Sequence, residues 1–157
     1  MCRDRFGVIE VPLFRQRACV LCYRYLFQSH ETVDFSYFQL AWRTASTQNE
    51  SLLVVTPDPT NETSLEEVCQ TLRSAEECDR WRQCCMAGKD CCDRQVEKMP
   101  PQVVVEAEQD EEQPRCASTW DGYACWDSTP PGTNAAQPCP LFISLAIASR
   151  KLVYVCR

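Results

Sequence analysis

The stretch Cys116-Ala-Ser-Thr-Trp-Asp-Gly-Tyr-Ala-Cys-Trp126 decides the fold of the C-terminal part of this chain. Asp121-Gly122 is a turn signal, and Thr119-Trp120 and Tyr123 to Trp126 flank it as the two arms of a hairpin. The residues from 116 to 140 are rich in Cys, Trp, Pro and Gly, a composition typical of short strands held by cross-links. Leu152 to Val155 is a further candidate strand. The sequence therefore predicts a small cysteine- and tryptophan-rich sheet over 116–157.

The chain has 157 residues, of which 13 are cysteines and one, His30, is a histidine. So many cysteines with so little histidine favour an oxidising compartment and a disulfide-held fold. A zinc site made of four thiolates remains arithmetically possible. Because the number of cysteines is odd, at least one thiol has no intramolecular partner.

Upstream, residues 64 to 99 contain the clearest helical pattern. Ser64-Leu65-Glu66-Glu67 has the form of a capping box. Apolar and cysteine side chains then recur at helical spacing: Leu65, Val68, Leu72, Ala75, Cys78, Cys85 and Cys92. The pattern predicts one helix over about 65–95, with a bend or brief interruption at Gly88, ended by Pro100-Pro101.

Two adjacent cysteine pairs, Cys84-Cys85 and Cys91-Cys92, lie on this helix. Seven residues along a helix separate Cα atoms by about 10 Å, too far for a disulfide within one helix. These cysteines must therefore pair elsewhere, and the cysteine-rich C-terminal segment is the expected place. The fold class predicted is α+β, small and disulfide-rich, with an N-terminal helix on short antiparallel strands.

The remaining segments are less informative. Residues 1–63 are an unassigned, largely irregular segment, and they contain two glycosylation sequons, at Asn49 and Asn61. Residues 106–114 form an acidic loop. No uninterrupted apolar run is long enough to cross a membrane, and arginines interrupt any signal peptide at the N-terminus.

Composition excludes several function classes. The net charge of −6 argues against nucleic-acid binding. The four glycines form no phosphate loop, and no nucleophile motif accompanies His30, so we expect neither an enzyme nor a bound cofactor or metal. Four aromatic side chains are candidates for the core or for a binding surface, with at least two in the core: Trp81, Trp120, Tyr123 and Trp126.

The motif Thr-Trp-Asp-Gly between cysteines, followed by Cys125-Trp126, Gly132 and Cys139-Pro140, resembles the hormone-binding extracellular domain of secretin-type (class B) G-protein-coupled receptors. Cys91-Cys92-Asp-Arg94 on the upstream helix is similar to that family's N-terminal helix. The doubled cysteines resemble the calcitonin-receptor-like branch, which includes invertebrate diuretic-hormone and pigment-dispersing-factor receptors. The resemblance covers residues 64–157.

The resemblance implies a disulfide pattern. Cys91 or Cys92 would pair with Cys125, Cys116 would pair with Cys156, and Cys139 would stay unpaired. It also implies a set of structural core residues: Trp120, Asp121, Gly122, Trp126, Gly132 and Pro140. The family's aspartate meets a basic side chain at the position where this chain has Tyr154. Eight cysteines receive no partner from the pattern: Cys2, Cys19, Cys22, Cys69, Cys78, Cys84, Cys85 and Cys92.

The function implied is binding of an amphipathic helical peptide hormone in a groove between the helix and the sheet. The implied contact residues are Leu65, Val68, Leu72 and Tyr123. The chain would lie on the extracellular side of the plasma membrane in the complete receptor, and G-protein contact would need a transmembrane bundle that this truncated chain lacks. A secreted cysteine-rich structural or inhibitory module is the first alternative, and an intracellular metal-binding protein is the second.

Overall fold

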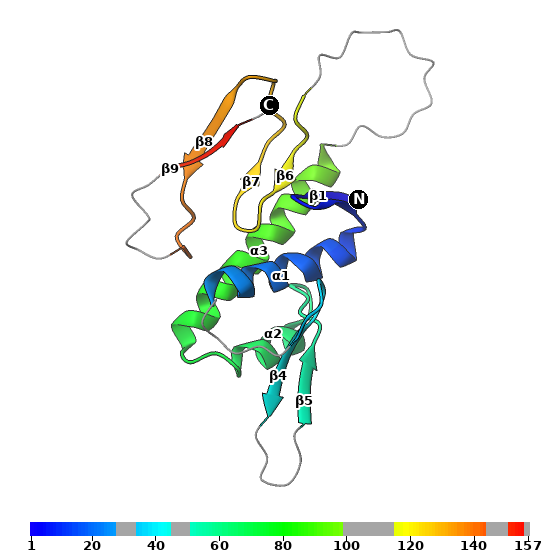
Figure 1. Cartoon of the computed structure of the whole chain (residues 1–157), viewed down its shortest axis with the longest axis vertical. Coiled ribbons are helices and arrows are strands. Elements are labelled where there is room, and N and C mark those ends of the chain that lie inside the picture. Colours follow the sequence, from blue (N-terminus) through cyan, green and yellow to red (C-terminus); the bar gives the residue numbers. More distant parts are fainter. Residues whose placement is uncertain (28–33, 45–50, 99–114, 144–150, 156–157) are drawn as a thin grey trace.

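The computed structural model describes residues 1–27, 34–44, 51–98, 115–143 and 151–155. Within these ranges, two long helices cross the centre of the molecule and three small sheets surround them (Figure 1). Five disulfides join described cysteines. This arrangement confirms the predicted α+β, disulfide-rich fold class.

The sheets join segments that are distant in sequence. The four-stranded sheet has the order β2-β1-β6-β7, a three-stranded sheet has the order β3-β4-β5, and β8 pairs with β9. The strand bounds are β1 Cys2–Asp4, β2 Gly7–Ile9, β3 Asp34–Phe35, β4 Leu40–Thr44, β5 Ser51–Val55, β6 Thr119–Trp120, β7 Cys125–Trp126, β8 Asn134–Pro138 and β9 Lys151–Val155. The predicted hairpin across Asp121-Gly122 and the strand at 152–155 are both present.

Residues 1–63 are not largely irregular, contrary to the expectation. Helix α1 spans Val11–Leu26, and Pro12 lies in its first turn. A run of seven consecutive residues from Arg17 to Tyr23 is buried, so the C-terminal half of this helix is covered on nearly all sides. A helix buried all round has no polar face, and the amphipathic period used to recognise helices is therefore absent.

The single helix expected over 65–95 is instead two helices, α2 (Glu62–Cys69) and α3 (Ala75–Glu97). The N-cap of α2 is Asn61, whose side chain accepts the N–H of Ser64. Ser64 is therefore inside α2 and does not cap it. The capping serine of α3 is Ser74, which accepts the N–H of Glu77 over 3.2 Å, while the Glu77 carboxylate accepts the N–H of Arg73.

The break between α2 and α3 allows a disulfide that one continuous helix would forbid. Cys69 and Cys78 are nine residues apart and are bonded, with Cα atoms 5.0 Å apart. In an unbroken helix the same Cα atoms would be about 13 Å apart. The chain therefore reverses over residues 70–74, and α2 packs beside both α3 and β5.

The core lies between α1 and α3, which make the most extensive helix–helix contact in the described structure. Two disulfides cross this contact, Cys19–Cys85 and Cys22–Cys84. Trp81 is fully buried there and donates its indole N–H to the carbonyl of Cys19 over 3.0 Å. The paired cysteines of α3 thus bond mainly to the N-terminal region, which corrects the expectation that the C-terminal segment receives them.

Gly88 neither bends nor interrupts α3, which runs continuously from Ala75 to Glu97. Its role is in packing, because a Cβ built at this position would lie 2.7 Å from the Cβ of Ala18 and 3.5 Å from the Trp120 ring. The absence of a side chain lets α1 and the β6 strand approach α3 closely. This close approach forms the back of the site described next.

Candidate functional site

The hairpin β6–β7 is organised by the carboxylate of Asp121. Its Oδ1 accepts the backbone N–H groups of Tyr123 and Ala124 over 3.0 and 2.8 Å, and its Oδ2 accepts the indole N–H of Trp126 over 2.7 Å. Gly122 has φ +122°, in the region that favours glycine, and a Cβ there would collide with the Tyr25 ring. The Asp-Gly pair therefore shapes the turn and fixes the Trp126 side chain.

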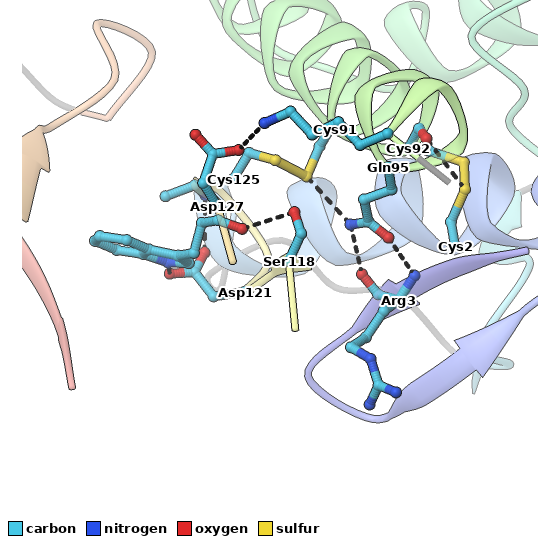
Figure 2. Close-up of a disulfide and its surroundings, with 12 residues drawn as sticks. Cys2, Arg3, Cys91, Cys92, Gln95, Ser118, Asp121, Cys125 and Asp127 are labelled. Carbon is cyan, nitrogen blue, oxygen red and sulfur yellow. Dashed lines mark hydrogen bonds and ion pairs between the residues drawn. A yellow bond between two sulfur atoms is a disulfide. The ribbon is translucent and has the colours of Figure 1, made fainter. Parts of the chain in front are cut away.

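Adjacent cysteines near the C-terminal end of α3 bond to two different strands of the same sheet. Cys91 is bonded to Cys125 on β7, and Cys92 is bonded to Cys2 on β1 (Figure 2). Neighbouring residues on a helix point about 100° apart, which gives the two bonds their different directions. The four-stranded sheet is consequently attached to α3 through two of its strands, β1 and β7.

Gln95 adds a third link between α3 and this sheet. Its side-chain oxygen accepts the N–H of Arg3 over 2.6 Å, and its amide nitrogen donates to the carbonyl of the same residue over 3.0 Å (Figure 2). The amide of Gln95 therefore satisfies both backbone groups of Arg3, as a neighbouring strand would. Strand β1 also pairs in parallel with β6, at Asp4 and Trp120.

A cleft of about 410 Å³ lies between α3, the β6–β7 hairpin and the segment that follows β8. Its volume is within the usual range for ligand sites. Helix α3 contributes Ala87, Asp90 and Arg94, which recur at helical spacing. The other lining residues are Trp120, Tyr123, Ala124, Cys125, Gln137, Pro140 and Phe142.

The cleft combines an apolar interior with charged edges. Trp120 and Phe142 are almost fully buried, whereas Asp90 and Arg94 are exposed. Burial raises the pKa of the Tyr123 phenol, and the nearby Asp121 carboxylate raises it further, so this side chain stays neutral at physiological pH. The site can therefore take an apolar side chain inside while its edges bind polar or charged groups.

Three charged side chains, Arg15, Lys89 and Asp93, join α1 to α3 away from the cleft. Asp93 forms ion pairs with Lys89 and Arg15 over 2.7 and 2.9 Å, and these partners lower the pKa of its carboxyl, the Lys89 hydrogen bond most strongly. The same contact raises the pKa of Lys89. This group links α1 to α3 and does not line the cleft.

The implied ligand-contact residues divide between the core and the cleft. Leu65 and Val68 are buried, and Leu72 is partly buried against the same core cluster, so these three pack inside the protein and do not form a ligand surface. The reason is the reversal at 70–74, which turns the apolar face of α2 inward. Tyr123 alone among the four lines the cleft.

The implied structural residues are placed as follows. Trp120 and Trp126 are buried, as Trp81 is, and Gly132 has φ +71° in the turn before β8. Pro140 lines the cleft. Cys139 is buried and is the free cysteine within the described residues. Cys116 is disulfide-bonded.

Several expectations concern residues that the structure does not describe. Cys156, Asn49 and the acidic residues 106–114 lie outside the described ranges, as does the side chain of Tyr154. Within those ranges no cluster of three or more His, Cys, Asp and Glu is arranged to hold a metal ion. No described helix is both long and apolar enough to span a membrane.

Sequence reasoning missed most of the cleft. Asp90 and Arg94 are four residues apart on α3, and Ala87 precedes Asp90 by three, so one helical face carries all three. This spacing could have identified the α3 face of the cleft from the sequence. Gln137 and Phe142 gave no such signal, because Gln137 is on β8, whose strand partner is the distant β9, and Phe142 follows β8 in irregular chain.

Comparison with known proteins gives matches in this same region. Residues 113–157 match the family model described as hormone receptor domain. The rat calcitonin receptor (Rattus norvegicus) is 42% identical over 50 residues, which are 32% of this chain and 8% of the receptor. The human receptor (Homo sapiens) is 42% identical over 45 residues, which are 29% of this chain and 10% of the receptor. The mouse receptor (Mus musculus) is 60% identical over 25 residues, which are 16% of this chain and 5% of the receptor.

These matches span a tenth or less of the length of the calcitonin receptors. No solved structure matches the chain. The matched residues 113–157 contain β6, β7, β8 and β9, and therefore one wall of the cleft. The resemblance predicted from the Trp-Asp-Gly and Cys-Trp motifs is confirmed.

Proposed function

We propose that this chain, whose residues 113–157 match the hormone receptor domain, binds a peptide hormone as the extracellular region of a secretin-type receptor. The observation that carries the proposal is the cleft between α3 and the β6–β7 hairpin. The matched segment supplies the hairpin, and the Cys91–Cys125 disulfide attaches it to α3. The hormone receptor domain is a receptor family and not an enzyme family.

The chemistry of the cleft fits one face of an amphipathic peptide helix. Such helices bind by placing apolar side chains, three and four residues apart, into an apolar groove. The accessible apolar surface comes from the partly exposed Ala87, Tyr123 and Pro140, with the buried Trp120 and Phe142 rings behind them. Arg94 can pair with an acidic group of the peptide, and Asp90 with a basic one, so that the charged edges set the direction in which the peptide lies.

The disulfides suit this function because they hold the cleft walls before the ligand arrives. Cys91–Cys125 fixes the distance between α3 and β7, and Gln137 donates to the carbonyl of Cys125 over 3.3 Å, which attaches β8 to the same point. Walls that are already in place lose less conformational freedom on binding. The protein would act on the extracellular side of the plasma membrane, where disulfides persist.

Contact with a G protein would belong to the membrane-spanning part of such a receptor. The alternative of a secreted structural or inhibitory module predicts a protein with the same disulfides but no peptide affinity. The receptor hypothesis and the secreted-module hypothesis therefore differ in one measurable property, the binding of a peptide hormone.

The test is a fluorescence-anisotropy titration of the secreted 157-residue chain with labelled calcitonin and a panel of other secretin-type hormones. Ala87→Trp fills the cleft and should weaken binding at least tenfold, about 1.4 kcal/mol. Met86→Trp is the matched control, because Met86 is the neighbouring residue on α3, is 39% exposed and does not line the cleft. Equal affinities for the two variants, or no binding by any hormone, would overturn the proposal.

A further inference from the structure

The sequon Asn61-Glu62-Thr63 lies at the start of α2, on the surface of the protein. Asn61 and Thr63 are both exposed, and Asn61 has extended backbone angles of φ −118° and ψ 100°. An N-linked glycan needs an accessible asparagine side chain followed by a hydroxyl residue two positions on. Both conditions are met in the folded protein.

The oxygen and the nitrogen of the Asn61 side-chain amide have different roles. Its Oδ1 accepts the N–H of Ser64 over 3.3 Å and so caps α2. Among the described residues none accepts a hydrogen bond from its Nδ2. A sugar on Nδ2 therefore leaves the helix cap intact, because capping uses only the oxygen.

From this geometry we infer that Asn61 carries an N-linked glycan. The inference depends on the proposed function only in requiring that the chain enter the secretory pathway. The glycan is transferred from a lipid-linked oligosaccharide diphosphate. A bond forms between Nδ2 and C1 of the first N-acetylglucosamine, the bond from C1 to the phosphate oxygen breaks, Nδ2 loses one proton, and the lipid diphosphate leaves.

The position of Asn61 separates the glycan from the cleft. Glu62, next to Asn61, pairs with Arg82 on α3, whereas Arg94 lines the cleft. Twelve residues of helix separate Arg82 from Arg94, a distance of about 18 Å. A glycan here covers the acidic face of α2, which Glu62, Glu66 and Glu67 form, and leaves the cleft open to a peptide.

Glycan occupancy at Asn61 can be measured directly in a variant that lacks the sequon at Asn49. The 157-residue chain with Asn49→Gln is expressed behind a cleavable signal peptide in human cells, and glycans are removed by peptide-N-glycosidase in ¹⁸O water. Peptide mapping should show ¹⁸O-aspartate at position 61. Adding Thr63→Ala should abolish this mark, and the matched change Thr63→Ser should retain it.

The outcomes separate this inference from the proposed function. An unmodified Asn61 in protein that has entered the endoplasmic reticulum, whether secreted or retained, overturns the glycan and says nothing against peptide binding. An occupied Asn61 in a protein without hormone affinity supports the glycan and contradicts the proposed function. Enzymatic release of the glycan should change calcitonin affinity less than twofold, and a larger change would contradict the placement away from the cleft.

Discussion

Trp126 donates its indole N–H to Oδ2 of Asp121 over 2.7 Å, and the other oxygen of this carboxylate accepts two backbone N–H groups of the turn. A single side chain therefore satisfies three donors between the strands of the hairpin. Because Tyr123 and Ala124, which line the cleft, are the two backbone donors, the carboxylate also fixes one wall of the proposed site.

Asp121→Asn should destabilise the protein by about 1–3 kcal/mol, because an NH₂ group then faces one of the three donors. The control is Asp127→Asn, which removes a carboxylate from the same hairpin. Its ion pair with Lys98 is exposed and worth less than about 1 kcal/mol. Urea unfolding followed by tryptophan fluorescence measures both, and equal losses would show that the Asp121 network has no special role.

Gly88→Ala should destabilise the protein by about 1–3 kcal/mol, even though alanine favours helix by about 1 kcal/mol. The new Cβ would lie 2.7 Å from that of Ala18 and 3.5 Å from the Trp120 ring, so α1 or α3 would have to shift within a packed core. Thermal unfolding measures the change. The double variant Ala18→Gly with Gly88→Ala should recover part of the loss, and a single variant more stable than the native protein would refute the packing argument.

Acid should weaken the contact between α1 and α3 through Asp93. Its carboxyl pKa is lowered in the folded state, so the stabilisation is present above the ordinary pKa of about 3.9 and is lost as pH falls through the lowered value. The side chain is 34% exposed, so the effect should stay below about 1 kcal/mol.

Asp93→Asn should therefore reduce stability at pH 7 and flatten its decline below about pH 4. Asp79→Asn, an exposed position on the same helix, is the control and should leave the pH profile unchanged. Unfolding by urea at a series of pH values tests this. A profile for Asp93→Asn that parallels the native one would contradict the assignment.

Mild reduction should open Cys69–Cys78 before the other disulfides that the structure describes. Both of its cysteines are partly exposed, whereas each of the other four bonds has at least one buried cysteine. Accessible disulfides react first with thiolate reductants. Graded reduction, alkylation and peptide mapping would establish the order, and early opening of Cys91–Cys125 would argue against it.

The hairpin was predictable from sequence because its signals are local. Asp121-Gly122 determines the turn, and the cysteine and tryptophan residues on both sides determine the strands. The overall fold class followed from the cysteine content together with the helical period before it. These features depend on neighbours within a few residues and not on the rest of the chain.

The N-terminal region was not predictable because its structure depends on distant partners. Helix α1 is buried all round along its C-terminal half, so it has no continuous polar stripe. Strand β1 pairs locally with β2, but its attachment to the rest of the fold is through the distant β6 and Gln95. The break at 70–74 was missed for a different reason, since Ser74 and Glu77 form a capping signal that the preceding Ser64 to Glu67 resembles closely. The cleft joins one face of α3 to the β6–β7 hairpin and to residues 137–142, so it could not be assembled from either part alone.

The central claim is that a peptide hormone binds between α3 and the β6–β7 hairpin. Hydrogen–deuterium exchange of the secreted chain, with and without saturating calcitonin-type peptide, tests it most directly. We predict slower exchange over residues 87–94 and 120–126 and no change over α2. Unchanged exchange at the cleft, or protection confined to α2, would contradict the account.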